Sequence, residues 1–214
     1  MDRRKALKTI GIGTGAITVT PAVVGIFQSC QKNNGQFTPI HFTNDEFSIV
    51  SKLMDLILPK TDIPGAIELK LPEFLDGYID VILSESAKQQ ISIGLEQFLT
   101  VALNESSKNK SSQLDLKDLD NQLAKYLKAG EGKQKELDKI AKQFFNKKKT
   151  NSKVEIPNIA LASSFAIKLR SLTITAFKTN EYIGENVLAY APIPGEQIGC
   201  IDLNEATGGK AWSL

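Results

Sequence analysis

Cysteine and histidine are scarce in this 214-residue chain, which contains 2 Cys and 1 His. Two cysteines are too few for a disulfide framework, for a four-thiolate zinc site or for a thiolate-held iron–sulfur cluster. A single histidine excludes a multi-histidine metal site, and the sequence has no CxxCH motif for covalent attachment of haem. These absences exclude much of metalloenzyme chemistry.

The chain also lacks an excess of charge of one sign, with 26 basic and 24 acidic residues. Positions 1–30 hold four of the basic residues and one of the acidic ones, which leaves 22 basic and 23 acidic residues in the remainder. This near-neutral body gives no electrostatic reason to expect nucleic acid or an anionic membrane as a partner. We interpret the lysine run at 147–149 as a helix end, where cations complement the helix dipole.

Residues 1–30 have the layout of an export signal. A short cationic start is followed by 19 uncharged residues at 9–27. Arg3 and Arg4 resemble the twin-arginine signal that sends folded proteins across the bacterial inner membrane, although Ala6 stands where an aromatic residue is usual. A retained transmembrane anchor is the alternative at this length. The many glycines and threonines favour a signal, because they make the stretch weakly hydrophobic.

Cys30 follows the small residue Ser29 at the end of this stretch, which resembles a lipoprotein processing site. Cleavage before Cys30 would leave its thiol to carry diacylglycerol, and acyl chains would hold the protein at a membrane. The alternative is an incidental cysteine in a signal that is cut elsewhere. We therefore predict a signal at 1–30, a polar tether at 31–42 and a folded domain at 43–214, exported to the periplasmic side and anchored by lipid.

Apolar residues recur at helical spacing through most of the predicted domain. Thr43 and Glu46 have the spacing of a capping box and begin the first helix, which Pro59 ends. Residues 61–66 are predicted to form a turn and residues 104–112 a solvated loop. The further predicted helices begin at Pro72, with a continuous apolar face from Leu71 to Ile82, at Ser86, at Asp115 or Asp118, and after the break at 129–132.

Residues 157–178 are the most apolar segment of the body, with large apolar side chains pointing in nearly every direction. A helix that is apolar all round is a buried one, and Lys168 and Arg170 argue against a membrane span. After Thr179 no helical period is visible, and a long irregular segment of this kind is usually functional. The sequence therefore predicts a mainly α fold: a compact domain of about six helices around a central buried helix, with an irregular C-terminal arm.

Reactive groups are few and scattered. His41 lies in the predicted tether, and we interpret it as incidental. No Gly-x-Ser-x-Gly elbow is present. The carboxylate pairs Asp62 with Glu68 and Asp76 with Asp80 are expected to be ordinary surface charges. The sequence thus offers no candidate catalytic, cofactor-binding or metal-binding residue.

Cys200 leaves two interpretations open. It is either a reactive thiol, able to form an intermolecular disulfide after export, or a small buried hydrophobic residue.

Several segments resemble the small subunit, called subunit 3 or gamma, of membrane-bound gluconate 2-dehydrogenase. Besides the twin-arginine start, they are residues 56–66 (LILPKTDIPGA), residues 71–76 (LPEFLD) and residues 172–200, which contain LTITAFKTNE, LAY, IPGE and GC. The chain departs from the family at Ala176 and Phe177, where Gly-Tyr is usual, and at Gln197, near a usual aromatic residue. The middle, residues 104–155, is similar only in being helical.

The resemblance implies a non-catalytic partner of a large FAD-containing dehydrogenase of the glucose–methanol–choline type, which oxidises a sugar or sugar acid. FAD would belong to that partner, and a cytochrome c subunit often takes the electrons in such complexes. The small subunit carries the only export signal, so the twin-arginine translocase would export both chains together. The family name does not give the substrate of this complex.

The aromatic C-terminal arm is the candidate docking surface, because Tyr and Phe anchors dominate interface energetics. Packing of these residues against the central helix is the alternative. Two other functions stay open: a freestanding exported lipoprotein that binds something without a redox partner, and an enzyme, which would need a flavin or metal motif that the sequence lacks. The candidate interface residues are Phe177, Tyr182, Tyr190, Pro194, Gly195 and Cys200.

Overall fold

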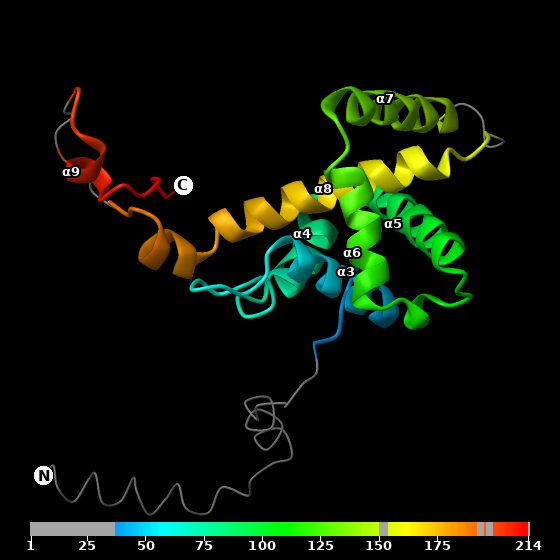
Figure 1. Ribbon diagram of the computed structural model, residues 1–214, viewed down its shortest axis with the longest axis horizontal. Helices are drawn as coiled ribbons and strands as arrows, with labels where there is room; N and C mark the ends of the chain where they lie inside the picture. The colour runs from blue at the N-terminus through cyan, green and yellow to red at the C-terminus, as the bar shows by residue number, and fades with distance from the viewer. Residues whose placement is uncertain (1–36, 150–153, 192–194, 196–198, 214) are drawn as a thin grey trace, which may run out of the picture. The chain divides into compact units, whose positions relative to one another are not determined.

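Six helices of twelve residues or more build the folded part of the computed structural model, which describes residues 37–149, 154–191, 195 and 199–213. Within these residues the only β-type pairing is one isolated bridge, so the predicted mainly α fold is confirmed. A main unit begins at Pro39. The helices are α3 (Asn44–Ile57), α4 (Leu71–Ile82), α5 (Glu85–Ser106), α6 (Leu116–Leu127), α7 (Glu131–Lys148) and α8 (Asn158–Lys178) (Figure 1).

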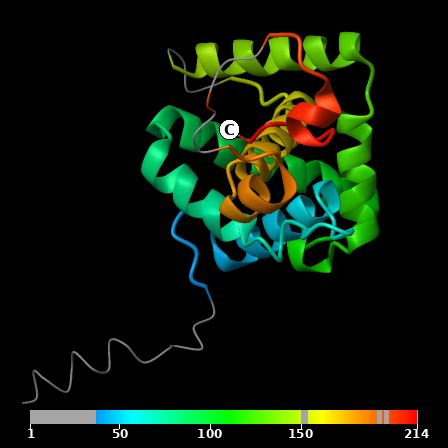
Figure 2. The ribbon, with the colours of Figure 1, turned by 90° about the vertical axis from the view of Figure 1, so that its left-hand side faces the viewer.

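α8 is the central helix, as its composition predicts. It packs against α3, α4, α5, α6 and α7, and both views show these helices arranged around it (Figures 1 and 2). Among the described helices, α8 alone is long and apolar enough to cross a membrane, but half of its apolar window is buried inside the protein. Lys168 and Arg170 are exposed. The apolar composition of α8 is thus explained by its place in the core.

The crossing of α5 and α8 is close because a glycine lies at it. A Cβ atom on Gly94 would come within 2.9 Å of the Phe165 Cβ. Beside this contact the ring of Phe98 lies 5.6 Å from that of Phe165 and 6.2 Å from that of Tyr126, measured between centroids. These three rings tie α5, α8 and α6 together at offset and tilted geometries that aromatic pairs favour.

Helix α7 covers the beginning of α8 through a second apolar cluster. This cluster consists of Leu137, Ala141 and Phe144 from α7 with Ala160 and Leu161 from α8. The Gln134 side chain donates to the carbonyls of Tyr126, Leu127 and Ala129, which caps the C-terminal end of α6. Lys147 and Lys148 lie in the last turn of α7, as predicted for a helix end.

The predicted helix starts at Thr43, Pro72 and Asp115 are confirmed, and the start at Ser86 is wrong. Thr43 with Glu46, and Asp115 with Asp118, form capping boxes at α3 and α6. The cap of α5 is Ser84 rather than Ser86, because α4 ends at Ile82 and the chain turns at once into the next helix.

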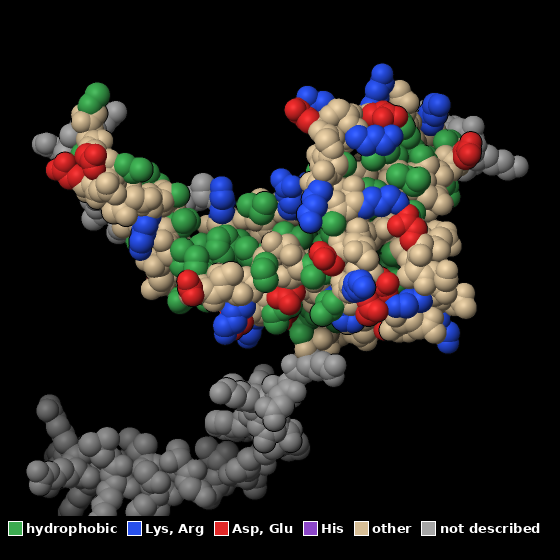
Figure 3. Space-filling model, viewed as in Figure 1, with side chains coloured by type: hydrophobic (Ala, Val, Ile, Leu, Met, Phe, Trp, Pro, Cys, Tyr) green, Lys and Arg blue, Asp and Glu red, His purple; other side chains and the backbone are tan. Residues whose placement is uncertain are grey.

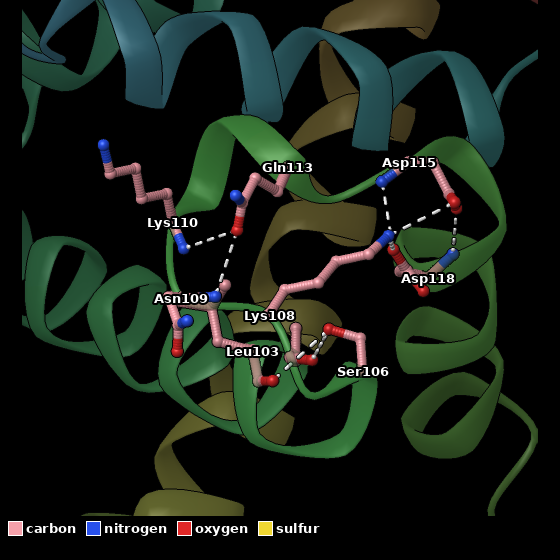
Figure 4. A network of polar contacts seen from close by, with 9 residues as sticks. Leu103, Ser106, Lys108, Asn109, Lys110, Gln113, Asp115 and Asp118 are labelled. Atoms are coloured by element: carbon pink, nitrogen blue, oxygen red, sulfur yellow. Dashed lines mark hydrogen bonds and ion pairs between the residues drawn. The ribbon is translucent and has the colours of Figure 1, made fainter.

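The loop predicted at 104–112 starts later than expected, since α5 continues to Ser106. Lys108 leaves this loop to pair with both Asp115 and Asp118 at the start of α6 (Figure 4). The side-chain oxygen of Gln113, in the short 3₁₀ turn η2 (Ser111–Gln113), accepts from the backbone N–H groups of Asn109 and Lys110.

Asp76 corrects the expectation that it is a surface carboxylate. It is fully buried and lies on the face of α4 that also buries Leu75 and Ile79. Its oxygens accept from the backbone N–H groups of residues 40, 41 and 42 at 2.6, 3.1 and 3.0 Å. We call residues 39–42 the entry segment. They belong to the main unit, so the chain joins the fold four residues before the predicted boundary at Thr43.

The apolar face predicted for α4 is divided between two environments. Leu71, Leu75 and Ile79 are buried in the core. Phe74, Tyr78 and Ile82 are exposed or partly exposed, and so is Val81. The apolar arc of this helix is therefore wider than the surface that the core covers.

The C-terminal arm contains two short helical segments that no sequence period predicts. The π-helical turn η3 (Ile183–Val187) follows α8 and is held by Ile183, which is fully buried. Beyond it, α9 (Leu203–Thr207) is capped by Asp202. The backbone of Ala189 pairs with Ala211 at 2.8 Å and with Ser213 at 2.9 Å, which joins the two ends of the arm.

Candidate functional site

A groove of about 600 Å³ lies between the α3–α4 loop and the start of the C-terminal arm. Its two walls are more than one hundred residues apart in the sequence. Figure 3 shows hydrophobic side chains gathered on the surface over this loop and the adjoining end of α8. The lining residues are Lys60, Thr61, Asp62, Ile63, Pro64, Glu68, Leu69, Lys70, Asn180, Glu181 and Tyr182.

The loop wall is shaped by a tight turn at Gly65. A Cβ atom at this position would lie 2.5 Å from the Lys60 nitrogen and 2.8 Å from the Pro59 carbonyl carbon, so only glycine fits here. The fully buried Ala66 next to it donates to the carbonyl of Leu58 at 2.9 Å. The predicted turn at 61–66 is therefore confirmed, and its glycine is required by lack of space for a side chain.

Charged groups of both signs line the loop wall. Lys60 and Glu68 form an ion pair across the loop at 2.5 Å, and this lysine lowers the pKa of the Glu68 carboxyl. Lys70 holds a left-handed backbone conformation, with φ of 53°, just before α4 begins. Such a conformation is uncommon for a lysine, and it turns the chain sharply from the groove into the helix.

The arm wall consists of Asn180, Glu181 and Tyr182. The Asn180 carbonyl accepts from the N–H of Gly184 at 2.9 Å, which continues the chain from α8 into η3. The Asn180 Oδ1 atom is buried and has no hydrogen-bond partner among the described residues. Tyr182 is 49% exposed, so its ring lies at the edge of the groove where a second molecule can cover it. The arm wall thus presents a half-exposed aromatic ring at the edge of the groove.

The rest of the arm presents large apolar side chains without covering them. Tyr190 is 53% exposed, Leu203 63% and Trp212 56%. Trp212 takes part in the backbone pairing between residue 189 and residues 211–213, and Tyr190 is the next residue after residue 189 on the other side. Tyr190 and Trp212 lie beside the same backbone pairing, and neighbouring exposed apolar residues are typical of interaction surfaces.

The structure separates the predicted interface residues into groups. Phe177 is partly buried and packs against the main core, as in the alternative interpretation of the aromatic residues. Tyr182 lines the groove, whereas Tyr190 lies further along the arm. Gly195 is exposed with φ of 68°, a left-handed conformation that suits a glycine. Pro194 lies outside the described residues.

Cys200 is exposed and has a free thiol, so the interpretation as a buried hydrophobic residue is wrong. Its φ of 55° is left-handed, which places it at a turn ahead of α9. Arg3, Arg4 and Cys30, the predicted signal and lipidation residues, lie outside the described residues.

Clustered reactive groups are not found in the part of the chain that the structure describes. No group of three or more His, Cys, Asp or Glu residues there could hold a metal ion. His41 lies in the entry segment, with its ring edge-to-face on Phe42 at 4.8 Å. Its Nε2 atom is buried with no hydrogen-bond partner among the described residues.

Sequence reasoning missed two features of this site. Residues 61–66 are predicted from the sequence only as a turn, and Trp212 is not among the candidate anchors. The sequence contains a signal for each. The loop carries part of the family resemblance, and Trp212 is the only tryptophan in the sequence. What the sequence does not reveal is that the loop meets residues 180–182.

The fold and the site together define a small helical domain that presents a groove and an exposed apolar arm. The chain belongs to the gluconate 2-dehydrogenase subunit 3 family, whose sequence model matches residues 44–195. Both walls of the groove lie inside the matched range, whereas α9 and Trp212 lie beyond it. No curated protein and no solved structure matches the chain.

Proposed function

We propose that this chain is the non-catalytic small subunit of a membrane-associated, FAD-dependent dehydrogenase of the glucose–methanol–choline type that oxidises a sugar or sugar acid. In this proposal the chain assists the export and assembly of the flavoprotein. FAD belongs to the large subunit, and a cytochrome c subunit can receive the electrons. Membership of the subunit 3 family supports a role inside a dehydrogenase complex.

The observation that carries the docking part of the proposal is the groove. It is built by residues 60–70 and 180–182, which come from two of the segments that carry the family resemblance. Tyr182 at its edge has the half-exposed aromatic character of an interface anchor.

The export part of the proposal rests on the nature of the cargo. A flavin binds a folded domain, so a flavoprotein that acquires FAD before export needs a translocase that accepts folded proteins. Arg3 and Arg4 provide the signal for such a route. After processing, Cys30 would carry lipid and hold the complex at the periplasmic side of a membrane.

The docking proposal is tested by replacing Tyr182 with alanine in the full chain and purifying it from solubilised membranes. We expect the amount of co-purified flavoprotein to fall by about tenfold or more, because truncation of an aromatic interface anchor costs about 2 kcal/mol or more of binding free energy. Leu116→Ala is the control, since Leu116 is similarly exposed at 53% but lies on α6. Equal recovery of flavoprotein with both variants would contradict docking at the groove.

The same purification distinguishes the subunit role from the two other functions, a freestanding lipoprotein and an enzyme. A freestanding lipoprotein would leave the membrane with no FAD-containing companion, and this result would overturn the proposed subunit role. An absorbance spectrum of the isolated chain is expected to show no flavin or metal band. A bound chromophore together with turnover of a sugar would show that the chain is itself the enzyme.

A further inference from the structure

The outer face of α4 is apolar, although the core does not cover it. We define this face as Phe74, Tyr78, Val81 and Ile82. Phe74 is 51% exposed, Val81 74% and Ile82 63%, and the rings of Phe74 and Tyr78 stack at 6.0 Å between centroids. At about 100° per residue these four positions fall within an arc of roughly 100°, so they form one continuous stripe along the helix.

Acidic residues of α4 lie away from this stripe. Glu73 and Asp80 project from the opposite side of the helix by the same helical count. Asp80 is close to Lys88, with 3.8 Å between the carboxylate oxygen and the ammonium nitrogen. The outer face therefore carries neither an acidic group that anionic surfaces would repel nor a cationic cluster that they would attract, so an apolar surface is the partner that suits it.

The position of the entry segment puts a limit on how far α4 can lie from a lipid anchor. Residues 40–42 are hydrogen-bonded to Asp76 in the middle of α4. Cys30 precedes Pro39 by nine residues, which span at most about 30 Å when fully extended. A helix with its side chains is about 10–12 Å across, so every side of α4 is within reach of the surface to which Cys30 is attached.

We propose that the outer face of α4 lies against the interfacial region of the lipid bilayer, where it inserts the stripe between Phe74 and Ile82. This inference rests on the proposed lipid anchor at Cys30. The anchor keeps the domain within reach of the bilayer, and the stripe determines which side of the domain faces the lipid. Helices with an aromatic and aliphatic face of this kind bury it at the boundary between headgroups and acyl chains.

This orientation separates two tasks on the molecule. The groove between residues 60–70 and 180–182 contacts the protein partner, and the outer face of α4 contacts lipid. Because the stripe carries no charge, its contact with the bilayer does not require anionic lipid and is insensitive to salt.

The test measures tryptophan fluorescence in protein tethered to phosphatidylcholine vesicles. A chain that begins at Cys30 keeps the whole main unit, and Cys200→Ser leaves Cys30 as the only thiol for coupling to a maleimide headgroup. Trp212→Phe removes the native tryptophan, and Val81→Trp then reports on the outer face of α4. The control is Ile140→Trp, because Ile140 is an exposed apolar residue of α7.

Brominated acyl chains quench only those tryptophans that enter the bilayer. We expect about a twofold loss of fluorescence for the tryptophan at 81 and little change for the one at 140, since an interfacial helix buries its apolar face about 5–10 Å deep. Equal quenching at both positions, or none at either, would overturn the proposal. The proposal would also be overturned if the tryptophan at position 81 became buried only when the flavoprotein is added. It would be overturned too if this tryptophan were buried in a dimer of the chain in solution, without vesicles.

The tether is chemical, so this result does not depend on natural lipidation. The anchor is tested separately by the mass of the N-terminal peptide of the protein purified from membranes. An unmodified Cys30 would contradict the proposed anchor, whereas quenching at position 81 would still support insertion of the outer face of α4.

Discussion

At the scale of single residues, Asp76 shows how one buried carboxylate joins the entry segment to the domain. Buried charges need hydrogen-bond donors, and three consecutive backbone N–H groups provide them here. Sequence pattern alone assigns this aspartate to the surface, because charged residues are almost never fully buried unless they are paired. The donors come from residues 40–42, more than thirty positions away, and no local signal shows that they meet Asp76.

Asp76→Asn is expected to lower the free energy of unfolding by about 2 kcal/mol, because an amide offers one acceptor oxygen and no charge to three donors. The control is Asp80→Asn, which alters a partly exposed side chain and is expected to change stability by less than about 0.5 kcal/mol. Urea unfolding measures both. Faster amide exchange at residues 40–42 should accompany the loss in the Asp76 variant alone. Equal stability of the two variants would contradict this role of Asp76.

Tyr126 is expected to make the stability of the domain depend on pH in the alkaline range. Burial, with the Glu105 carboxylate nearby, raises the pKa of this phenol from 10.0 to about 12. Since the pKa is higher in the folded state, the contribution to stability is complete below pH 10 and is lost as the pH rises to 12.

We expect the wild-type chain to lose roughly 2 kcal/mol more stability than Tyr126→Phe between pH 10 and pH 12. The lysines deprotonate in both proteins, so the difference isolates the phenol. Thermal unfolding across this pH range measures it. Parallel curves for the two proteins would show that Tyr126 does not titrate differently on folding.

At the scale of elements, capping motifs and apolar periodicity predict where the helices lie, but they do not predict which helices contact one another. Capping boxes at Thr43 and Asp115 mark real helix starts, because their donors and acceptors are three residues apart. The apolar arc of α4 was correctly recognised as helical, but periodicity does not reveal that α3 and α8 cover only part of it. The turns of the arm, η3 and α9, are too short to produce a period at all.

The crossing of α5 and α8 depends on Gly94. Replacing it with alanine is expected to destabilise the domain by about 1–3 kcal/mol, because the new methyl group would meet the Phe165 Cβ at 2.9 Å. Gly77→Ala is the control, since no atom lies within 4 Å of its Cβ position in α4. That change should stabilise the protein by about 0.5–1 kcal/mol through helix propensity. Calorimetry of both variants checks the opposite signs, and stabilisation by Gly94→Ala would contradict the close crossing.

At the scale of the whole molecule, function lies in surfaces that meet only after folding. The family resemblance was recognised from motifs at both ends of the domain, and the match over residues 44–195 confirms it. The groove could not be predicted from the sequence, because its two walls are brought together by α8 and the α3–α4 loop in three dimensions. One of the six predicted interface residues lies in a different environment for the same reason: Phe177 packs against the core, and only the fold shows this.

The account depends most on the claim that this chain escorts another polypeptide, and the location of the flavoprotein tests it. Arg3 and Arg4 are both replaced by lysine, with Lys5→Arg and Lys8→Arg as a charge-conserving control. Cell fractions are then assayed for both proteins. We predict that the arginine-pair variant leaves this chain and the flavoprotein together in the cytoplasm, while the control exports both. A flavoprotein that reaches the periplasm normally while this chain stays inside would contradict the escort role.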